Sequence, residues 1–383
     1  MNIMQMAQHA NPGKIIIGAG ALKEIVNEMG PRSFPLIVTD RGIADSGILD
    51  RLKSLFEEGQ LLFRVFDETL PDPSAEMVEK AAVVYRESGC NMLIGLGGGS
   101  PMDVAKACGL LLKGGKLSEY FEGKPLPEEV PPIFAVPTTA GTGAEVSRVV
   151  IITDNVSQEK KVLRGIQMTP KVAILDPELL TTIPPKLAAD TGTDALAHAV
   201  ESYVSKLSTP FSEAFSLQAL RLIATNLIPA VENPANLEAT GNMLMASCMT
   251  GLAFANVGLG LVHALGHAVG ARTHIAHGRS CALFMAPVMK FNAPVCEEKF
   301  SLMAQAMGIN HNGLMPDETA SEVIDAVTHL LDSIQIPLTL ADTDMKLALD
   351  EEIVTEIMTA PPTGFNPRMP TREEVIALLK TAM

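Results

Sequence analysis

The first half of the chain alternates short apolar runs with amphipathic stretches. The apolar runs predict strands at residues 14–18, 34–40, 61–67, 91–99, 132–139, 148–154 and 172–177. Helical periodicity lies between the earlier runs, at residues 21–30, 47–59 and 75–89. This alternation is typical of βαβ units, so we expect a largely parallel sheet with helices packed on it.

The hydrophobic pattern changes at Pro184 and Pro185, which interrupt the chain. Beyond about residue 186 strand signals largely vanish, and long helical runs rich in Ala, Leu and Met dominate. We therefore predict two domains: an α/β domain over residues 1–183 and an all-helical domain over residues 184–383.

Composition narrows the class of protein. The net charge is −15 and the pI is about 5.0, which argues against a nucleic-acid or anionic-membrane partner. The five cysteines show no CxxC pair and indicate reduced thiols rather than disulfides or a zinc knuckle. The first 14 residues lack the features of a signal peptide, so we expect a cytoplasmic protein.

One stretch, residues 243–262, carries no charge and is long enough to cross a bilayer. It also contains polar residues and several glycines, and it runs directly into His263 and His267. We interpret it as a buried helix of a soluble helical domain.

Histidines and one aspartate gather in the second half of the chain. Asp194 and His198 are four residues apart, which places both side chains on one face of a helix, and His263 and His267 repeat that spacing. Together with His277, these residue types suit a divalent transition metal. Three interpretations of His267 stay open at this point: a fifth ligand, a proton relay or a core histidine. His274 is interpreted as an ordinary loop residue.

A glycine-rich loop follows the predicted strand 91–99. It consists of Gly97, Gly98, Gly99 and Ser100 and enters a helix at about Pro101. Glycines let the backbone approach a ligand closely, and a helix start offers free N–H groups to a phosphate. A tight strand-to-helix turn that binds no ligand would also explain these glycines. The spacing matches neither GxGxxG nor a P-loop.

A second polar loop, residues 137–148, also follows a strand. Its hydroxyls come from Thr138, Thr139, Thr142 and Ser147, which would suit phosphate, ribose or amide groups, although turn formers alone would explain the stretch. Asp40 closes strand 34–40, where a carboxylate is able to bind ribose hydroxyls and repel a 2′-phosphate, favouring NAD over NADP. An ordinary turn aspartate would equally explain Asp40.

These motifs, in this order, resemble the iron-containing (group III) alcohol dehydrogenases over essentially the whole chain. The matching stretches are GGGSPMDVAKA, PTTAGTGAEVSR, DTGTDALAHAVESY and the segment from LVHALGHAVG to AHG. The resemblance implies a Rossmann-like dinucleotide-binding domain followed by an all-α metal-binding domain, the fold shared with dehydroquinate synthase-like proteins, with the site between the two domains.

The resemblance also implies roles for single residues. Asp194, His198, His263 and His277 would be metal ligands for Fe²⁺, although ligand type alone also permits zinc, cobalt or manganese. His267 would transfer protons, and Phe254 would lie near the nicotinamide rather than serve only the core. Contacts to NAD(H) are implied for Asp40, Gly97, Gly98, Gly99, Ser100, Asp103, Thr138, Thr139, Thr142, Ser147 and Lys160, with Lys161 as the alternative to Lys160.

The predicted activity is the metal-dependent interconversion of a small primary alcohol or diol and its aldehyde with NAD(H), in a homodimer or larger homo-oligomer. The stretch after His277 departs from the family pattern, because Arg279, Ser280 and Cys281 stand where small or apolar residues are common. If Arg279 is not simply solvated, it favours a polar or anionic aldehyde. Two competing hypotheses are a glycerol dehydrogenase-like enzyme and a metal-binding structural or filament protein without turnover.

Overall fold

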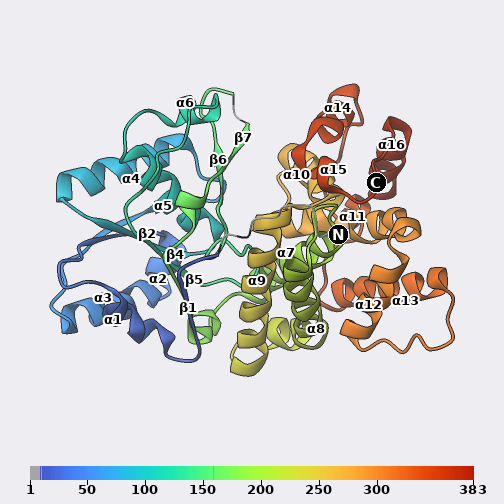
Figure 1. Ribbon diagram of the computed structural model, residues 1–383, viewed down its shortest axis with the longest axis horizontal. Helices are drawn as coiled ribbons and strands as arrows, with labels where there is room; N and C mark the ends of the chain where they lie inside the picture. Colours follow the sequence, from blue (N-terminus) through green and yellow to red (C-terminus); the bar gives the residue numbers. More distant parts are fainter. Residues whose placement is uncertain (1–8, 10, 158) are drawn as a thin grey trace. The chain divides into compact units, whose positions relative to one another are not determined.

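Residues 9, 11–157 and 159–383 are described in the computed structural model of the chain (Figure 1). They form two compact units: Ile183–Met383 together with His9, and the residues between His9 and Ile183. The functional roles predicted for residues 1–183 and 184–383 stay predictions. Most of the N-terminal stretch in which no signal peptide was expected lies outside the described residues.

The α/β unit is built on a six-stranded parallel sheet, which confirms the predicted sheet type. Its strand order is β1 (Lys14–Ile17), β8 (Val172–Leu175), β5 (Ile133–Pro137), β4 (Met92–Gly97), β2 (Pro35–Asp40) and β3 (Arg64–Thr69). The central strands β4 and β5 are buried throughout, as expected of strands covered on both faces.

Helices flank this sheet on its two sides, with α1 and α3 on one side and α4 on the other (Figure 1). The helices are η1 (Ala21–Glu24), α1 (Ile25–Glu28), α2 (Arg41–Asp45), α3 (Ile48–Glu58), α4 (Ala75–Ser88), α5 (Gly99–Leu111), α6 (Leu117–Phe121), η2 (Ile166–Met168) and η3 (Pro177–Leu180). The helix predicted over residues 21–30 is shorter than expected and consists of η1 followed by α1.

One predicted strand lies outside the parallel sheet. Run 148–154 forms β6 (Val149–Thr153), which pairs antiparallel with β7 (Lys160–Arg164) in a separate two-stranded sheet. Strand β7 was missed because three of its five residues are basic and only Leu163 is buried, so it lacks an apolar signal. Helix α5 also begins earlier than predicted, at Gly99 rather than at about Pro101.

The sheet changes direction between β2 and β4. The chain runs outward from β2 to β3, returns to β4 on the other side of β2 and then continues to β5. In open α/β sheets such a reversal leaves a crevice at the carboxyl ends of the two strands, where ligands bind. Here those ends carry Asp40 and Gly97.

A buried charge network ties α5 to the segment leading into β6. The Lys106 ammonium is fully buried and donates to the carbonyl oxygens of Ser147 and Val149 at 3.1 and 3.3 Å. Asp103, one turn earlier on α5, accepts the Ile151 amide at 3.0 Å. Burial raises the pKa of Asp103 to about 6 and that of Glu145 to about 7, while it lowers the pKa of Lys106.

The second unit contains only helices among its described residues, which confirms the predicted all-helical half. They are α7 (Pro185–Val204), α8 (Pro210–Glu232), α9 (Leu237–Val257), α10 (Leu261–Thr273), α11 (His277–Asn292), η4 (Ala293–Val295), α12 (Glu297–Met307), α13 (Pro316–Ser333), η5 (Leu340–Asp342), α14 (Glu351–Thr359), α15 (Pro361–Phe365) and α16 (Arg372–Thr381). Helix α7 is central: it packs against α8, α9, α10 and α11.

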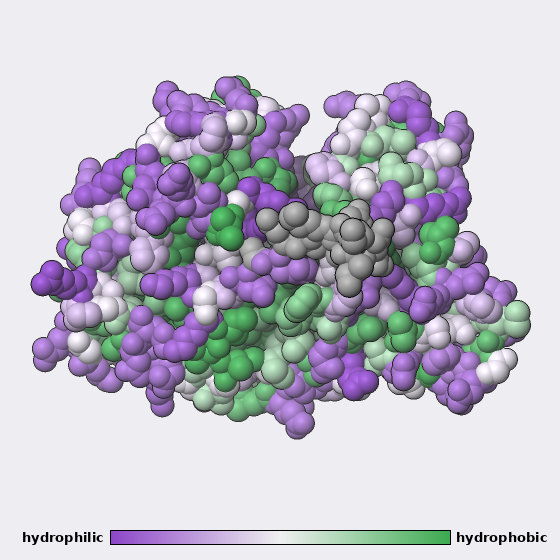
Figure 2. All heavy atoms as spheres, viewed as in Figure 1, coloured by the Kyte–Doolittle hydropathy of each residue, from purple (hydrophilic) through white to green (hydrophobic). Residues whose placement is uncertain are grey.

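The uncharged stretch 243–262 is not one continuous helix. Helix α9 ends at Val257, and Gly258 follows as its C-cap. The axis of α10 is bent by 100° from that of α9. Residues of α9 from Met243 onward are largely buried, as expected of a core helix. Helix α8 is also long and apolar enough to span a membrane, but it packs against α7 and α9. Figure 2 shows polar side chains spread over the visible face of this unit.

Replacing Glu145 by glutamine should flatten the pH dependence of stability. Glu145 is 1% exposed, and its pKa of about 7 lies above the ordinary 4.5, so the folded chain holds its proton more tightly than the unfolded chain. The wild-type free energy of unfolding therefore falls as the pH rises from 4.5, the ordinary pKa, to about 7, the pKa in the folded chain. Between pH 5 and 8 it should fall by about 2 kcal/mol more than in Glu145→Gln.

Urea unfolding followed by circular dichroism at both pH values measures this difference, since the chain has no tryptophan. Replacing the exposed Glu129 by glutamine is the matched control and should leave the wild-type pH dependence intact. Equal pH dependence in wild type and Glu145→Gln would show that Glu145 does not carry the buried proton.

Candidate metal centre and cofactor loops

Helix α7 supplies the first two candidate metal ligands. Proline at the start of this helix suits a helix N-terminus, and the alanines around Asp194 and His198 allow neighbouring helices to approach closely. Both side chains are buried, at 4% exposure, and lie one turn apart. As the i, i+4 spacing predicts, the two residues occupy the same buried face of one helix.

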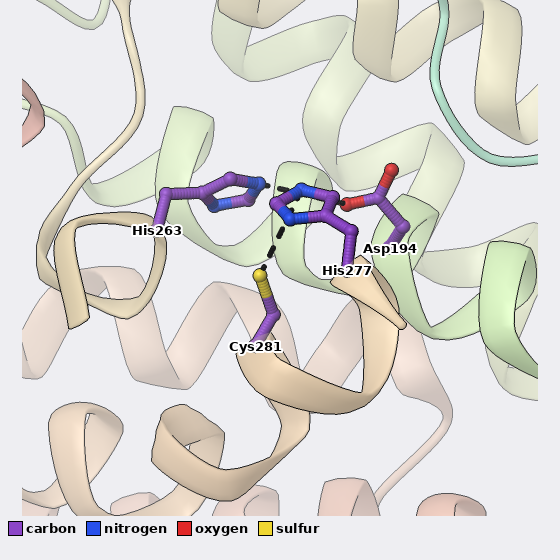
Figure 3. Close-up of side chains that lie close together, drawn as sticks. All are labelled: Asp194, His263, His277 and Cys281. Carbon is purple, nitrogen blue, oxygen red and sulfur yellow. Dashed lines mark hydrogen bonds and ion pairs between the residues drawn. The ribbon is translucent and has the colours of Figure 1, made fainter. Parts of the chain in front are cut away.

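Histidines from two further helices converge on the Asp194 carboxylate (Figure 3). Asp194 Oδ1 lies 3.6 Å from His263 Nε2, on α10, and 3.2 Å from His277 Nε2, at the first residue of α11. His198 Nε2 is 3.6 Å from the same oxygen. The three predicted histidine ligands thus surround one carboxylate oxygen of the fourth.

Cys281 is a member of this cluster that the sequence analysis did not treat as a ligand. It lies one turn after His277 on α11, and its Sγ is 3.9 Å from His277 Nε2. The donor atoms of Asp194, His263, His277 and Cys281 all lie within 4.8 Å of one another. The i, i+4 spacing from His277 was the available signal.

The cluster is suited to a cation. Asp194 Oδ1 and His263 Nε2 are buried without a hydrogen-bond partner, which is costly unless a bound group satisfies them. Burial alone would raise the pKa of Asp194, but His198 and His277 hold it well below its usual range. One carboxylate and several imidazoles fit a divalent transition metal. The His277 side chain is 41% exposed, so the cluster is open on that side.

Glu201 orients His263, a role that sequence reasoning missed. One of its carboxylate oxygens lies 2.6 Å from His263 Nδ1, and the other accepts the Val262 amide at 2.6 Å. Burial opposes a charge on His263, yet Glu201 and Asp194 raise its pKa to about 9. A carboxylate on the far ring nitrogen fixes an imidazole ligand with its other nitrogen toward a metal. The position of Glu201, seven residues after Asp194 on a buried helix, was the signal.

Gly278 allows α11 to approach α7. A Cβ at Gly278 would lie 1.9 Å from the Asp190 carbonyl oxygen, a contact that no side chain can adopt without a shift of the backbone. Because Gly278 follows His277 directly, this close approach brings the His277 ring to Asp194.

Two predicted site residues pack against the ligand rings. The His267 ring stacks on His277 at a centroid distance of 5.1 Å, and it meets His263 edge-on at 5.7 Å. Phe254 is 7% exposed and stacks on His198 at 4.4 Å. Both therefore lie beside the candidate ligands. His274 ends α10 with φ of 55° and is exposed.

Arg279 forms an ion pair with Asp190 on α7. Its Nε lies 2.5 Å from Asp190 Oδ1, and the side chains are 21% and 12% exposed. Arg279 is thus held by a carboxylate instead of lying free in solvent, and its positive charge is neutralised by Asp190. Its charge is compensated, which weakens the predicted preference for an anionic aldehyde.

In the α/β unit, the two predicted cofactor loops lie against each other. The Thr138 amide donates to the Gly97 carbonyl at 3.0 Å. A Cβ at Gly98 would lie 3.5 Å from Thr139 Oγ1, and one at Gly99 would lie 3.2 Å from Thr142 Cγ2. Ser100 lies at the start of α5, where helix amide groups are free to bind an anion.

Asp40 lies at the same edge of the sheet as the glycine loop. It caps α2 by accepting the Ile43 amide at 3.0 Å, and a Cβ at Gly97 would lie 3.4 Å from its Oδ2. The hydroxyls of Thr138 and Thr139 are buried without a hydrogen-bond partner.

Other predicted cofactor contacts have protein partners. Asp103 and Ser147 belong to the buried network around Lys106, where Ser147 Oγ lies 3.3 Å from the ammonium. Lys160 pairs with Asp72 at 2.5 Å on the surface, and the alternative Lys161 pairs with Glu159.

Comparison with known proteins places the chain in one family. Residues 12–177 match the profile of iron-containing alcohol dehydrogenase, and residues 188–383 match that of the Fe-containing alcohol dehydrogenase family, C-terminal. Proteins of this family use NAD(H) and a divalent metal, mainly iron.

Three similar proteins illustrate the match. An NAD-dependent methanol dehydrogenase of Bacillus methanolicus is 35% identical over 97% of this chain and 98% of its own. A 1,3-propanediol dehydrogenase of Klebsiella pneumoniae is 37% identical over 91% and 90%. The structure of an alcohol dehydrogenase from Oenococcus oeni superposes with a TM-score of 0.94 and 30% identity, over 99% of this chain and 100% of that one.

These homologues are alcohol, diol and aldehyde oxidoreductases, in agreement with the predicted class of activity. The chain belongs to the iron-containing alcohol dehydrogenase family.

Proposed function

We propose that this protein interconverts a small, uncharged primary alcohol or diol and its aldehyde with NAD(H) at a metal centre built around Asp194. The observation that carries the proposal is the convergence of three imidazoles, at 3.2, 3.6 and 3.6 Å, on one buried carboxylate oxygen of Asp194 that has no hydrogen bond. Family membership supplies the class of reaction.

The proposed ligands are Asp194, His198, His263 and His277, with Fe²⁺ as the metal that the family favours. A bound divalent metal supplies Lewis-acid polarisation of the substrate oxygen. Glu201 holds the His263 ring so that its Nε2 faces Asp194, and Gly278 allows His277 to reach the cluster. The exposed side of His277 leaves room for a small substrate.

His267 is the proposed proton carrier. Its ring is partly exposed and stacks on His277, so it is placed to exchange a proton between the ligand cluster and solvent. Phe254 is proposed to fix the His198 ring and to give the substrate pocket an apolar wall.

NAD(H) is proposed to bind at the carboxyl edge of the α/β sheet. The amides at the start of α5 and the glycines before it suit a pyrophosphate, and the unpartnered hydroxyls of Thr138 and Thr139 suit polar groups of the cofactor. Asp40 is proposed to bind the adenosine ribose. Asp103, Thr142 and Ser147 then shape this edge through protein contacts.

Small, uncharged substrates are favoured because Asp190 neutralises the charge of Arg279, so Arg279 does not offer a free cation to an anionic substrate. Methanol and 1,3-propanediol, named for two relatives, define the class of alcohol to test first. A division into an NAD-binding domain (1–183) and a metal- and substrate-binding domain (184–383), a cytoplasmic location and a homodimer complete the proposal. The location rests on the sequence features described above, and the homodimer or larger homo-oligomer rests on likeness to the family.

Turnover should require His277. Fe²⁺-loaded protein should oxidise NADH when given a short aldehyde. His277→Ala should lower the iron content and should lower kcat/KM by at least about tenfold, because it removes a ligand. Iron content by atomic absorption and NADH absorbance measure the two effects.

His274→Asn is the matched control, since it alters an exposed histidine three residues earlier and asparagine tolerates the positive φ found there. It should keep both iron and activity. Unchanged iron and turnover in His277→Ala would overturn the ligand assignment, whereas inertness of iron-loaded wild type across an aldehyde panel would overturn the proposed activity.

Asp40 should set the choice between NADH and NADPH. Asp40→Asn keeps an N-cap side chain for α2 but removes the charge that would repel a 2′-phosphate. The ratio of kcat/KM for NADPH to that for NADH should rise about tenfold, a change worth about 1.4 kcal/mol. Asp40→Gly should act in the same direction.

Asp45→Asn, an exposed aspartate at the end of the same short helix, is the control and should leave this ratio unchanged. If Asp40→Asn behaves like Asp45→Asn, Asp40 does not read the ribose.

A further inference from the structure

Cys281 lies inside the metal centre rather than in the apolar core around it. It is fully buried on α11, on the face that carries His277. Figure 3 shows its thiol directed toward the space enclosed by Asp194, His263 and His277. Asp194 Oδ1 and His263 Nε2 in this cluster are buried without a hydrogen bond. The thiol therefore lies beside polar atoms, whereas an ordinary core thiol is surrounded by apolar groups.

The printed distances between these donor atoms are close to those expected in a tetrahedral metal site. Metal–ligand bonds of about 2.0–2.1 Å to nitrogen or oxygen and about 2.3 Å to sulfur imply donor–donor distances of about 3.3–3.6 Å. The structure has 3.2 and 3.6 Å from Asp194 Oδ1 to His277 and His263, and 3.9 Å from His277 Nε2 to Cys281 Sγ. All four donor atoms lie within 4.8 Å of one another, so they are close enough to share one small cation after the side chains adjust.

The neighbouring helix holds the thiol in place. A Cβ at Gly266, on α10, would lie 3.0 Å from Cys281 Sγ and 3.2 Å from its backbone nitrogen. Glycine at this position lets α10 and α11 approach, so the sulfur lies close to the helix that carries His263.

We propose that Cys281 is a sulfur ligand which, with Asp194, His263 and His277, gives this centre a second donor set suited to zinc. The proposal rests on the metal centre of the proposed function. His198 completes the nitrogen and oxygen set that suits iron, and its ring stacks on Phe254 and His263. Cys281 completes a softer set, because thiolate ligands favour zinc. Binding breaks the S–H bond, and the proton passes to solvent.

Cobalt reports the sulfur ligand directly. Wild-type protein loaded with Co²⁺ should show a near-ultraviolet thiolate-to-cobalt charge-transfer band together with visible d–d bands. Cys281→Ala should lose the charge-transfer band, keep the d–d bands, and bind zinc at least about tenfold more weakly in competition with a chelator. Iron affinity should change less than zinc affinity.

Cys90→Ala is the matched control, because Cys90 is a buried thiol outside the cluster, and it should keep both sets of bands. X-ray absorption of zinc-loaded wild type tests the same ligand without a variant and should show one sulfur at about 2.3 Å. Visible d–d bands in wild type without a charge-transfer band, or a zinc shell without sulfur, would overturn the sulfur ligand. Absence of any cobalt or zinc binding would instead overturn the metal centre itself.

Discussion

The Asp194 carboxylate has one oxygen inside the helical unit with no hydrogen-bond donor, and the surrounding helices are arranged around it. A buried anion must be compensated, and here the compensation comes from imidazoles on α7, α10 and α11. Glu201 fixes one imidazole and Gly278 admits another. The residues that pack these helices closely are therefore the same residues that form the candidate metal centre.

The sequence predicted the parts of this centre that depend on local spacing. The i, i+4 pair Asp194 and His198 needs only a helix to share a face. Helical spacing places Glu201 on the helix of Asp194 and Cys281 one turn after His277. Their roles were not predicted, because these also depend on which helices meet, and spacing does not encode that. Arg279 shows the same limit: its partner Asp190 is 89 residues away in the chain, so the sequence alone could not show that its charge is compensated.

The same distinction between local pattern and long-range pairing holds in the α/β unit. Strands β2, β4 and β5 were predictable because burial on both faces makes them continuously apolar. Strand β7 was not, since it is basic and mostly exposed. Among predicted cofactor residues, Asp40 lies beside the glycine loop, whereas Lys160 pairs with Asp72. The motifs indicated all of these residues as cofactor contacts. The strand order at the β2–β4 reversal explains why Asp40 and the glycine loop lie together.

The proposed metal centre requires one metal ion between Asp194, His263 and His277. Anomalous diffraction from crystals of the iron-loaded protein, measured on both sides of the iron absorption edge, tests it most directly. One strong peak is expected at about 2 Å from the Asp194 carboxylate and from the two imidazole nitrogens. Stoichiometric iron with its peak elsewhere would contradict it.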